Sequence, residues 1–586
     1  MEYNKLSKLN KETVLAVVEN WFSASVSWDK NWRDNCVTWY DYYHGRHWNS
    51  DEIAALEERG QAVTTYNHIK PIIDSIIGSE RQNRPKVTMA GRTLDDQQVA
   101  DAKTKLYDYI QYNSRTDDEL DKCIRDAFVT GRGWLYVYPD TSNNTPDIKH
   151  SFVDYRDMFV DSLSLRDDLS DSRYLHYAKF TDSDIIASQF PQYKEQQDTK
   201  FSSVFNFESS SEDDIYYQEK DRNRVRLINT WFRDENGDVH TVIWVKGQVL
   251  YYKKDPYTMK KFPFMQYTVE RDMDNFPYGL VKSMVSAQDE VNKRHSKALH
   301  YLNSKSVLAE EDAFVDFAKA EVTLAKPNGV TLLTDGALSN NKVQIIDNTA
   351  LASTHIQMMD IAKSTMYALV GLNAGFVGQA SQYESAKKTS MSIAQAQNSL
   401  VPILNKLRIS RYELAYITMK LVPDFYNDAR IIRLIEPNGS YAFMPVNQVK
   451  LMDDNTIQKI NDMTTDDVDI IIEDAPRGLN EKEEQFNQLL QIQGQTSRPI
   501  PMEILLRYSS IKDKHQLAND LQSYYQVETQ LQQAQQIIQQ LQQQVQSLGG
   551  QIQQQQSQIV QVQSARAVDK EVSKVKEKLN STMGVL

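Results

Sequence analysis

A heptad repeat near the C-terminal end restricts the fold of this chain more than any other feature. In a glutamine-rich stretch from about 521 to 563, apolar residues recur in alternating steps of three and four, with Gln555 as the one polar interruption. The apolar positions are Tyr524, Val527, Leu531, Ala534, Ile538, Leu541, Val545, Leu548, Ile552, Ile559 and Val562. This spacing predicts a coiled coil, and its mostly glutamine flanks suit self-association of many identical chains rather than selection of a charged partner.

The same region carries two further signals. Gly549 and Gly550 lie inside the repeat, and because a glycine costs about 1 kcal/mol relative to alanine in a helix, we predict a break or a frayed tip there. Beyond the repeat, cations recur every four residues at Arg566, Lys570, Lys574 and Lys578. We interpret this basic stripe as a solvated tail rather than a DNA contact.

Length, composition and cysteine content bound the class of protein. A chain of 586 residues with 40% hydrophobic and 25% charged residues can fold into three or four domains. Cys36 and Cys123 form no metal-ligand spacing, so we expect neither a zinc site nor a disulfide scaffold, and we expect a reducing cytoplasm. The first residues lack the apolar core of a signal peptide, and no run of about 18 apolar residues occurs, so we expect no membrane span.

The net charge of −13 argues against a protein that grips nucleic acid over its whole surface, because such binding uses lysine and arginine to displace counterions. A pore through which DNA slides would instead benefit from repelling phosphates. The sign of the charge alone does not choose between these possibilities.

Five isoleucines predict a buried helix near residue 70, with Gly78 as its end and Pro85 as a barrier to its continuation. They stand at helical spacing at Ile69, Ile72, Ile73, Ile76 and Ile77. An extended basic segment is expected to follow, with Arg81, Arg84, Lys86 and Arg92. Upstream, residues 10–60 are expected to be helical, and we interpret the aromatic and basic cluster from Trp39 to Trp48 as a packed anchor rather than a base-stacking platform.

The next part of the chain predicts a sheet. A helix is expected from about 96 to 130, followed by a turn at Gly131–Gly133 and a strand at Trp134–Tyr138. From about 150 to 275 the pattern is rich in strands, and two apolar runs around the sequence ENGD predict a hairpin. The runs are Val225–Phe232 and Val242–Tyr252, and the acidic stretch Phe207–Asp214 is expected to be an exposed loop.

A helix from about 277 to 305 carries apolar residues on one face and charges on the other. Asp289 stands four residues before Lys293, and Glu290 stands four before Arg294, the order that favours intrahelical ion pairs. Three lysines have no such acid upstream and are the candidates for contacts outside the helix: Lys282, Lys297 and Lys305.

Two more helices follow. Residues 306–350 predict short strands, a turn at Pro327–Gly329 and an acidic start at Glu310, Glu311 and Asp312. A helix at Leu351–Val370, a glycine-containing loop and a helix from Ser385 to near Leu421 come next, and Pro402 should kink the last of these. A strand at Val468–Ile472 and a helical stretch from Glu481 lead into the heptad repeat.

Catalytic and cofactor motifs are missing from the sequence. The glycines of the 371–385 loop are followed by Gln379 and Ala380, not by the lysine and serine or threonine of a phosphate-binding loop. We also find no zinc-protease HExxH sequence, no paired metal spacing and no nucleophile elbow. We therefore expect a protein that is not an enzyme and that needs no cofactor or metal.

Several segments, in this order and spacing, resemble the portal proteins of tailed double-stranded DNA bacteriophages of the short-tailed (podovirus) type. The resemblance covers about 35 to 565, and no single motif is as specific as a metal-binding signature. The segments that carry it are Tyr43, Gly45 and Trp48; Asn67–Pro85; Gly131–Gly133; PYGLVKSMVSAQDEVNKR at 277–294; GLNAGFVGQASQYES at 371–385; DDVDIIIEDAPRGLNEKEEQF at 466–486; and the helical C-terminal tract.

The resemblance implies an α+β, mainly α, portal fold assembled as a ring of about twelve copies. The implied parts are a wing at 1–276, a stem helix at 277–305, a clip at 306–350, a second stem helix at 351–370, a tunnel loop at 371–390, a long helix returning to the wing at 391–480, a crown at 481–523 and a coiled-coil barrel with a basic tail at 524–586. On this interpretation, the arginines of Asn67–Arg92 contact neighbouring subunits or capsid.

The implied function is a channel at one vertex of the virion capsid for DNA packaging and ejection. The implied partners are double-stranded DNA passing non-specifically, the terminase, the major capsid protein, a scaffold, and a tail adaptor or head-completion protein, with assembly in the host cytoplasm. Residues proposed to face DNA are Lys282, Lys297, Gln382, Tyr383, Lys387 and Lys388, and residues proposed to contact terminase or adaptor are Glu310, Glu311 and Asp312.

Two alternatives remain open. A coiled-coil tail or scaffold protein of a virion would explain the glutamine tract but not the three helices between 277 and 421. A nuclease or a packaging ATPase would need a metal-carboxylate or phosphate-binding site, for which we find no signature.

Overall fold

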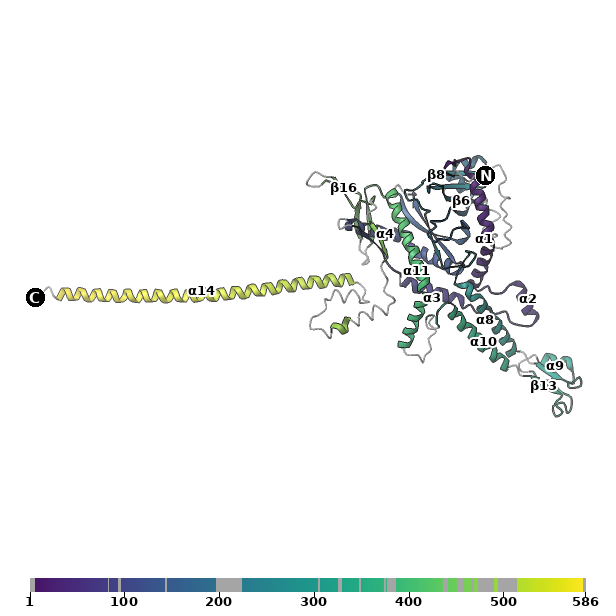
Figure 1. Ribbon diagram of the computed structural model, residues 1–586. Helices are drawn as coiled ribbons and strands as arrows, with labels where there is room; N and C mark the ends of the chain where they lie inside the picture. Colours follow the sequence, from purple (N-terminus) through teal and green to yellow (C-terminus); the bar gives the residue numbers. More distant parts are fainter. Residues whose placement is uncertain are drawn as a thin grey trace. The chain divides into compact units, whose positions relative to one another are not determined.

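The structure is a computed structural model of mixed helix and sheet in which helices predominate (Figure 1). It describes residues 6–82, 84–92, 96–142, 145–196, 224–303, 306–324, 329–346, 349–373, 376, 386–435, 441–451, 457–464, 468–472, 489–493 and 514–582. The chain forms two compact units, one of Met1–Glu436 with Tyr441–Gly478, and one of Pro437–Ser440 with Leu479–Leu586.

Helices form much of the first unit, and their bounds differ from the prediction at two places. The N-terminal helices are α1 (Val14–His44), α2 (Ser50–Glu58), α3 (Ile69–Gln82), α4 (Gln97–Ser114), α5 (Thr116–Thr130) and α6 (Ser183–Gln189), with short 3-10 turns η1 (Leu6–Lys8), η2 (Tyr155–Asp157) and η3 (Pro191–Gln196). The later helices are α8 (Leu280–Asn303), α9 (Phe317–Leu324), α10 (Thr349–Leu369) and α11 (Ala386–Phe425). The predicted helices at 277–305 and 351–370 correspond to α8 and α10.

The isoleucine face of α3 is buried as predicted, but Gly78 does not end the helix. Gly78 lies on the exposed side, where no close neighbour requires a glycine, and a single helical glycine costs only about 1 kcal/mol, which is too little to end the helix. One more turn brings Glu80 inside, where it is 6% exposed and pairs with Arg84. Arg81 therefore belongs to the helix rather than to an extended segment.

The helix predicted from 96 to 130 is two helices that meet at Arg115, which has a left-handed backbone with φ of 49°. The second helix starts with three acidic residues, Asp117, Asp118 and Glu119, which suit a helix N-terminus. The aromatic cluster is also partly inside a helix, because Trp39 and Tyr43 belong to α1. Both side chains are buried in the main core, which confirms the packed-anchor interpretation.

Two antiparallel sheets continue the first unit. A three-stranded sheet has the order β3 (Asp147–Val153), β2 (Arg132–Asp140), β9 (Phe264–Thr268). A five-stranded sheet has the order β4 (Met158–Val160), β5 (Tyr174–Asp182), β6 (Arg224–Arg233), β7 (Val239–Val245), β8 (Gln248–Lys254). The β6–β7 hairpin is confirmed, but the second apolar run is two strands, because the chain turns at Gly247, where φ is 79°. The 207–214 stretch lies outside the described residues.

Short strand pairs complete this unit, and the predicted strand at Val468–Ile472 is confirmed as β18. It pairs with β1 (Val87–Gly91), so the segment after α3 is joined to residues almost 400 positions later. The other pairs are β10 (Glu270–Arg271) with β11 (Pro277–Tyr278), β12 (Ser306–Ala309) with β13 (Val343–Ile346), β14 (Arg430–Ile435) with β15 (Tyr441–Val446), and β16 (Gln448–Leu451) with β17 (Ile457–Ile460).

The entry to α8 is fixed by close backbone contacts with the core. A Cβ at Gly131 would stand 2.2 Å from the Tyr278 nitrogen, one at Gly133 would stand 2.1 Å from the Cys123 carbonyl oxygen, and one at Gly279 would stand 2.2 Å from the Phe128 carbonyl oxygen. These positions admit only glycine because any side chain would overlap backbone. Gly131, Gly133 and Gly279 therefore allow the start of α8 and the start of β2 to pack closely against α5.

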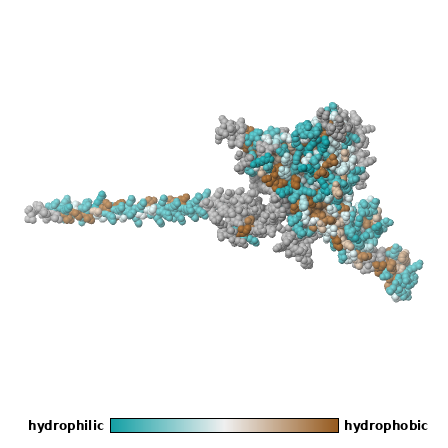
Figure 2. Space-filling model, in the orientation of Figure 1, coloured by the Kyte–Doolittle hydropathy of each residue, from teal (hydrophilic) through white to brown (hydrophobic). Residues whose placement is uncertain are grey.

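The second unit contains α14 (Lys514–Thr582), a continuous helix of 69 residues and about 100 Å. The predicted break at Gly549 and Gly550 is wrong, because both lie inside the helix, where extending an existing helix is much easier than starting one. The basic stripe is helical too. The heptad residues are exposed in the single chain, for example 55% for Leu531 and 53% for Leu541, and Figure 2 shows apolar residues recurring along the otherwise polar helix.

None of the helices in the described ranges combines the length and the apolar content that crossing a bilayer requires.

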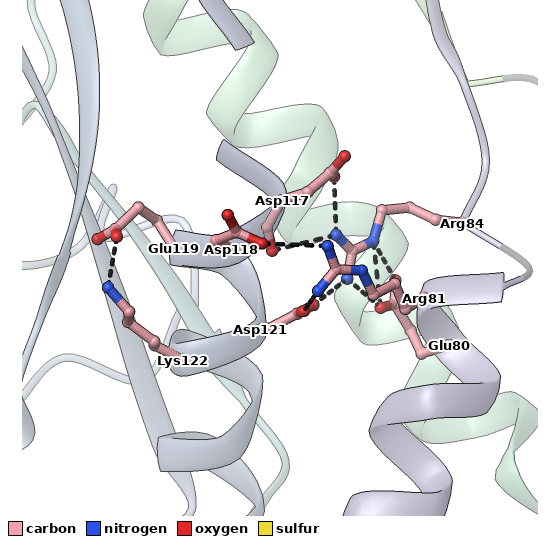
Figure 3. Close-up of polar contacts among 8 residues, drawn as sticks. All are labelled: Glu80, Arg81, Arg84, Asp117, Asp118, Glu119, Asp121 and Lys122. Atoms are coloured by element: carbon pink, nitrogen blue, oxygen red, sulfur yellow. Dashed lines mark hydrogen bonds and ion pairs between the residues drawn. The ribbon is translucent and has the colours of Figure 1, made fainter. Parts of the chain in front are cut away.

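A buried ion-pair network joins α3 to α5 (Figure 3). The Arg84 side chain is 8% exposed, and its guanidinium lies 2.5 Å from Glu80, 2.7 Å from Asp117 and 2.6 Å from Asp121. Burial alone would lower the pKa of Arg84, but the carboxylate partners raise it above its ordinary value. Arg81 pairs from the outside with Asp118 and Asp121. Both arginines are thus paired within the chain, and the expectation that they contact neighbouring subunits or capsid stays a prediction.

We expect Arg84→Ala to lower the free energy of unfolding by about 3 kcal/mol, because it leaves the buried Glu80 carboxylate without its cation and leaves Asp121 paired with Arg81 alone. Urea unfolding of the full chain, followed by near-UV circular dichroism, measures the loss. Arg81→Ala is the matched control, since its side chain is 54% exposed and its loss should be much smaller. Equal losses in the two variants would show that the network does not depend on Arg84.

Candidate functional site

The α8 and α10 helices lie side by side and run in opposite directions, joined at their far end by the antiparallel pair β12–β13 (Figure 1). Apolar side chains such as Met284, Val291 and Met366 are fully buried. Nearer the β12–β13 end, the ring of Tyr301 stacks on His355 at 5.5 Å. The pair thus forms a helical hairpin with its own packed seam.

A third segment covers another side of α8 through polar contacts. We call residues 59–68 the strap. Gln288, Asn292 and Ser296 stand at four-residue intervals, so they form one row on α8, and each is at most 1% exposed. The hydrogen bonds of this row are His68 N to Gln288 Oε1 at 3.0 Å, Gln288 Nε2 to Tyr66 O at 2.7 Å, Tyr66 N to Asn292 Oδ1 at 3.1 Å, and Ser296 Oγ to Ala62 O at 2.8 Å. Sequence reasoning missed this row, although polar residues at every fourth position were a visible signal.

His47 completes the strap contact from the other side. The Asn292 amide donates to His47 Nδ1 at 2.8 Å, and His47 Nε2 donates to the Tyr42 carbonyl at 2.8 Å. Burial lowers the pKa of His47, which favours the neutral ring that this arrangement needs. The strap is therefore held in one register by buried amides and a neutral histidine. Apolar packing contributes little, because the Val63 and Tyr66 side chains of the strap are 40% and 49% exposed.

The solvent face of α8 carries a row of lysines. Lys282, Lys293 and Lys297 fall within a sector of about 60° around the helix axis. The structure thus brings the two predicted residues, Lys282 and Lys297, onto one face. Lys282 is not without an acid, since it lies 4.0 Å from Asp272 and 4.4 Å from the centre of the Tyr278 ring. A row of exposed cations of this kind can contact phosphates without reading sequence.

The predicted intrahelical pairs of α8 are both present. Arg294 lies 2.5 Å from Glu290, and Lys293 lies 3.9 Å from Asp289 and 3.4 Å from Glu52 of α2. Lys297 has no ion pair among the residues that the structure describes, and it is exposed. It is therefore the cation of this face most available to a partner.

The acidic start of the 306–346 region is partly neutralised within the chain. Lys342 lies 2.5 Å from Asp312 and 3.7 Å from Glu310, and its hydrogen bond lowers the pKa of Asp312. Glu311 is exposed, so it is the freest carboxylate of the three. The region also contains the helix α9, where only short strands were predicted.

Exposed apolar side chains are frequent on α10 and in the 306–346 region. Such contiguous apolar surface on a soluble protein marks an interface with another molecule. On α10, four of the five fall within a sector of about 80° around the helix axis, and Ile356 at 42% exposed lies on another side. The four are Leu351 at 50% exposed, Met358 at 45%, Ile361 at 61% and Leu369 at 52%. In 306–346 they include Val315 at 63%, Phe317 at 70%, Leu332 at 72% and Ile345 at 61%.

Five predicted residues lie at the edge of the described chain or outside it. Gln382 and Tyr383 are outside the described residues, as is Lys305. The helix α11 begins at Ala386, so Lys387 and Lys388 belong to its first turn rather than to the loop that was predicted to extend to 390. Both Pro402 and Pro423 lie inside α11, and the kink at Pro402 stays a prediction.

No group of three or more His, Cys, Asp or Glu side chains in the described ranges is placed to hold a metal ion. The arrangement offers a helical hairpin, a lysine face and apolar surfaces, which are the features of contact with large partners.

Comparison with known proteins identifies a matching protein family. The sequence matches the phage P22-like portal protein family over residues 19–571. It is similar to the portal protein of Helicobacter pylori bacteriophage KHP30, at 21% identity over 468 residues, which cover 77% of this chain and 72% of that protein. Among solved structures, a chain from the virion of a native gene transfer agent particle is similar at 8% identity, with 78% of this chain and 94% of that chain covered and a TM-score of 0.33.

We expect Asn292→Ala to release the strap locally, because it leaves the part-buried Tyr66 N–H without its acceptor, at a cost of about 1 kcal/mol. Hydrogen exchange of the full chain, read by mass spectrometry, should show faster exchange in residues 60–68 and unchanged exchange in β6. Ser286→Ala, on the exposed face of α8, is the control. Unchanged protection of the strap in the Asn292 variant would mean that other contacts hold it.

Proposed function

The chain belongs to the phage P22-like portal protein family, and we propose that about twelve copies of it form a ring whose channel carries double-stranded DNA into and out of a capsid. The observation that carries this proposal is the family match, which runs from residue 19 to 571 and so includes both α8–α10 and most of α14. A coiled-coil tail or scaffold protein would account for α14 but not for the α8–α10 hairpin.

Its place and partners follow from the same premise. The ring occupies one vertex of the virion capsid, where it meets the major capsid protein and, during assembly in the host cytoplasm, a scaffold. It docks the terminase while DNA is packaged and a tail adaptor or head-completion protein afterwards. DNA passes through without sequence recognition.

The parts of the fold take the following roles in this proposal. Residues 1–276 form the wing, α8 and α10 form the stem, and 306–350 forms the clip. The loop from 371, which ends where α11 begins at Ala386, approaches DNA, residues 481–523 form the crown and α14 forms the barrel. Support comes from the α8–α10 hairpin, which leaves the core at a glycine-fixed point and ends in the small β12–β13 region.

Ring closure needs two different surfaces on each copy, because a cyclic ring is built from head-to-tail contacts. The exposed stripe of Leu351, Met358, Ile361 and Leu369 on α10 offers one of them. The apolar residues of the clip offer a continuation of the same interface. The Arg84 network, being satisfied within the chain, is a support of the wing rather than a ring contact.

The charge of the ring suits sliding rather than gripping. About twelve copies at −13 each would carry roughly −150, so the ring as a whole repels phosphate. The lysine row of α8, with Lys282 and Lys297, damps this repulsion locally and touches phosphates only briefly. From the loop and the start of α11, Gln382, Tyr383, Lys387 and Lys388 approach DNA in the same way. Glu310, Glu311 and Asp312 face terminase or adaptor, with Glu311 the freest.

We expect Ile361→Asp to abolish rings, because burying an unpaired carboxylate in an apolar interface costs several kcal/mol. Negative-stain electron microscopy of the purified protein should show rings with a central channel for the wild type and dispersed subunits for the variant. Ser353→Asp adds the same charge on another exposed side of α10 and should keep the rings. Absence of rings in the wild type would contradict the proposed function, whereas rings in Ile361→Asp would contradict only the assignment of the α10 stripe.

We expect the double change Lys387→Ala with Lys388→Ala to leave rings intact and to lower genome retention several-fold, because two phosphate contacts near the channel are lost. Packaging assays in phage that carry the variant portal measure the retained genome. Lys570→Ala with Lys574→Ala, in the exposed basic stripe of α14, is the control. Unchanged retention in the first variant would remove these lysines from the DNA path.

A further inference from the structure

The heptad stripe of α14 does not continue to the end of the helix. We call Tyr524–Val562 the first seam. If the same alternating steps of four and three continued beyond Val562, the next positions would be Arg566, Asp569, Ser573 and Lys576, all of them polar. A different set of apolar residues occupies this stretch instead, at Ala565, Val568, Val572 and Val575, again in steps of three and four. We call these four residues the second seam.

The second seam stands one residue out of phase with the first. One residue rotates a helix face by about 100°, so the two seams point in different directions. No loop absorbs this shift, because α14 is helical without interruption from Lys514 to Thr582. The side chains of Val568, Val572 and Val575 are 61%, 47% and 57% exposed, so the second seam is unpartnered in the single chain.

The flanks of the second seam carry charges where those of the first carry glutamine. With Val572 and Val575 as the core pair of one heptad, Glu571 and Lys576 take the two flanking positions. They are five residues apart. In a parallel, in-register pair of helices, that is the separation at which the flanking residue of one helix faces the flanking residue of the other. Two copies of this chain therefore place Glu571 against Lys576 on both sides of the seam.

We propose that the second seam is a separate parallel contact between copies of this chain, and that it joins α14 to a different neighbouring copy than the first seam does. The proposal rests on the proposed function only in requiring several copies side by side. Because each seam pairs with the same seam of another copy, the α14 helices alternate between first-seam and second-seam contacts and repeat by pairs, whereas the head-to-tail contacts of the rest of the ring repeat copy by copy. The occupant is a second copy, because the opposite charges that the seam needs are its own. A single pair of straight helices cannot bury both seams against each other, since the seams face about 100° apart.

The two seams therefore have different structural roles. The first is long and its flanks are nearly uncharged, so it contributes apolar burial without selecting an axial position. The second is short and its Glu571–Lys576 pairs are satisfied in one register only. It therefore sets the register of neighbouring helices, and by linking each helix to a second neighbour it extends the contact around the assembly.

Cysteine cross-linking of the full-length protein tests the proposal. The wild type serves as the blank, because Cys36 and Cys123 are buried. Under mild oxidation, Val568→Cys and Val575→Cys should each give linked dimers, since only a parallel, in-register contact brings both positions onto themselves. Lys574→Cys lies outside both seams and should link at least about five-fold less. Failure of either seam position to link, or equal linking of Lys574→Cys, would overturn the proposal.

A double variant tests the claim of different neighbours. Leu541→Cys in the first seam should give dimers alone, and combined with Val572→Cys it should give a ladder of trimers and larger products. Products that stop at dimers would show that both seams join the same two helices and would overturn this part of the proposal. Rings seen by electron microscopy in the same samples would show that the proposed function stands regardless.

Exchange of the flanking charges tests whether Glu571 and Lys576 set the register of the second seam. Glu571→Lys should lower the linking of Val572→Cys several-fold, because lysine then faces Lys576, while the linking of Leu541→Cys stays unchanged. Adding Lys576→Glu to Glu571→Lys restores opposite charges and should restore the linking. If the double exchange fails to restore it, or if Glu571→Lys has no effect, the register is not set by these charges.

Discussion

The contact of backbone with backbone at Gly131, Gly133 and Gly279 is the constraint on which the rest of the first unit depends. These glycines let the end of α5, the start of β2 and the entry of α8 approach to a distance that no side chain would permit. Trp32 closes the same junction, with its indole N–H donating to the Pro277 carbonyl at 2.7 Å. The direction in which α8 leaves the core is thereby set by main chain, and everything that α8 carries, from the lysine row to the β12–β13 region, inherits that direction.

Much of the fold was predictable where one physical effect dominates a segment. The isoleucines of α3 and the amphipathic α8 each bury one face, and periodicity alone identifies them. The β6–β7 hairpin was predictable from two apolar runs around a turn sequence. The errors occur where a glycine or a turn has two possible roles. Gly78 and Gly549 occur inside helices because a single glycine costs too little to end a helix that is already formed, and Arg115 breaks a helix that periodicity would have joined.

The candidate site was less predictable, for a different physical reason. Lys282 and Lys297 share a face of α8 as helical spacing requires. Asp272 and Lys342, however, reach the predicted residues Lys282 and Asp312 from outside any helical spacing, about ten and thirty residues away. Pairings of this kind depend on tertiary structure and leave no local pattern. The polar row of Gln288, Asn292 and Ser296 did leave one. Its partner, the strap, contributes backbone groups, which any sequence would provide.

The glutamine flanks of the first seam determine how the association of α14 depends on salt. Ion pairs at an exposed surface weaken as salt rises, since mobile ions screen charges over about 10 Å at 0.1 M, whereas apolar burial is not weakened in this way. DNA confined at high density is surrounded by its own concentrated counterions. In the proposed ring, a seam with hardly any charge to screen would keep its strength there, so most of α14 would associate equally well whether the space around it is empty or filled with nucleic acid.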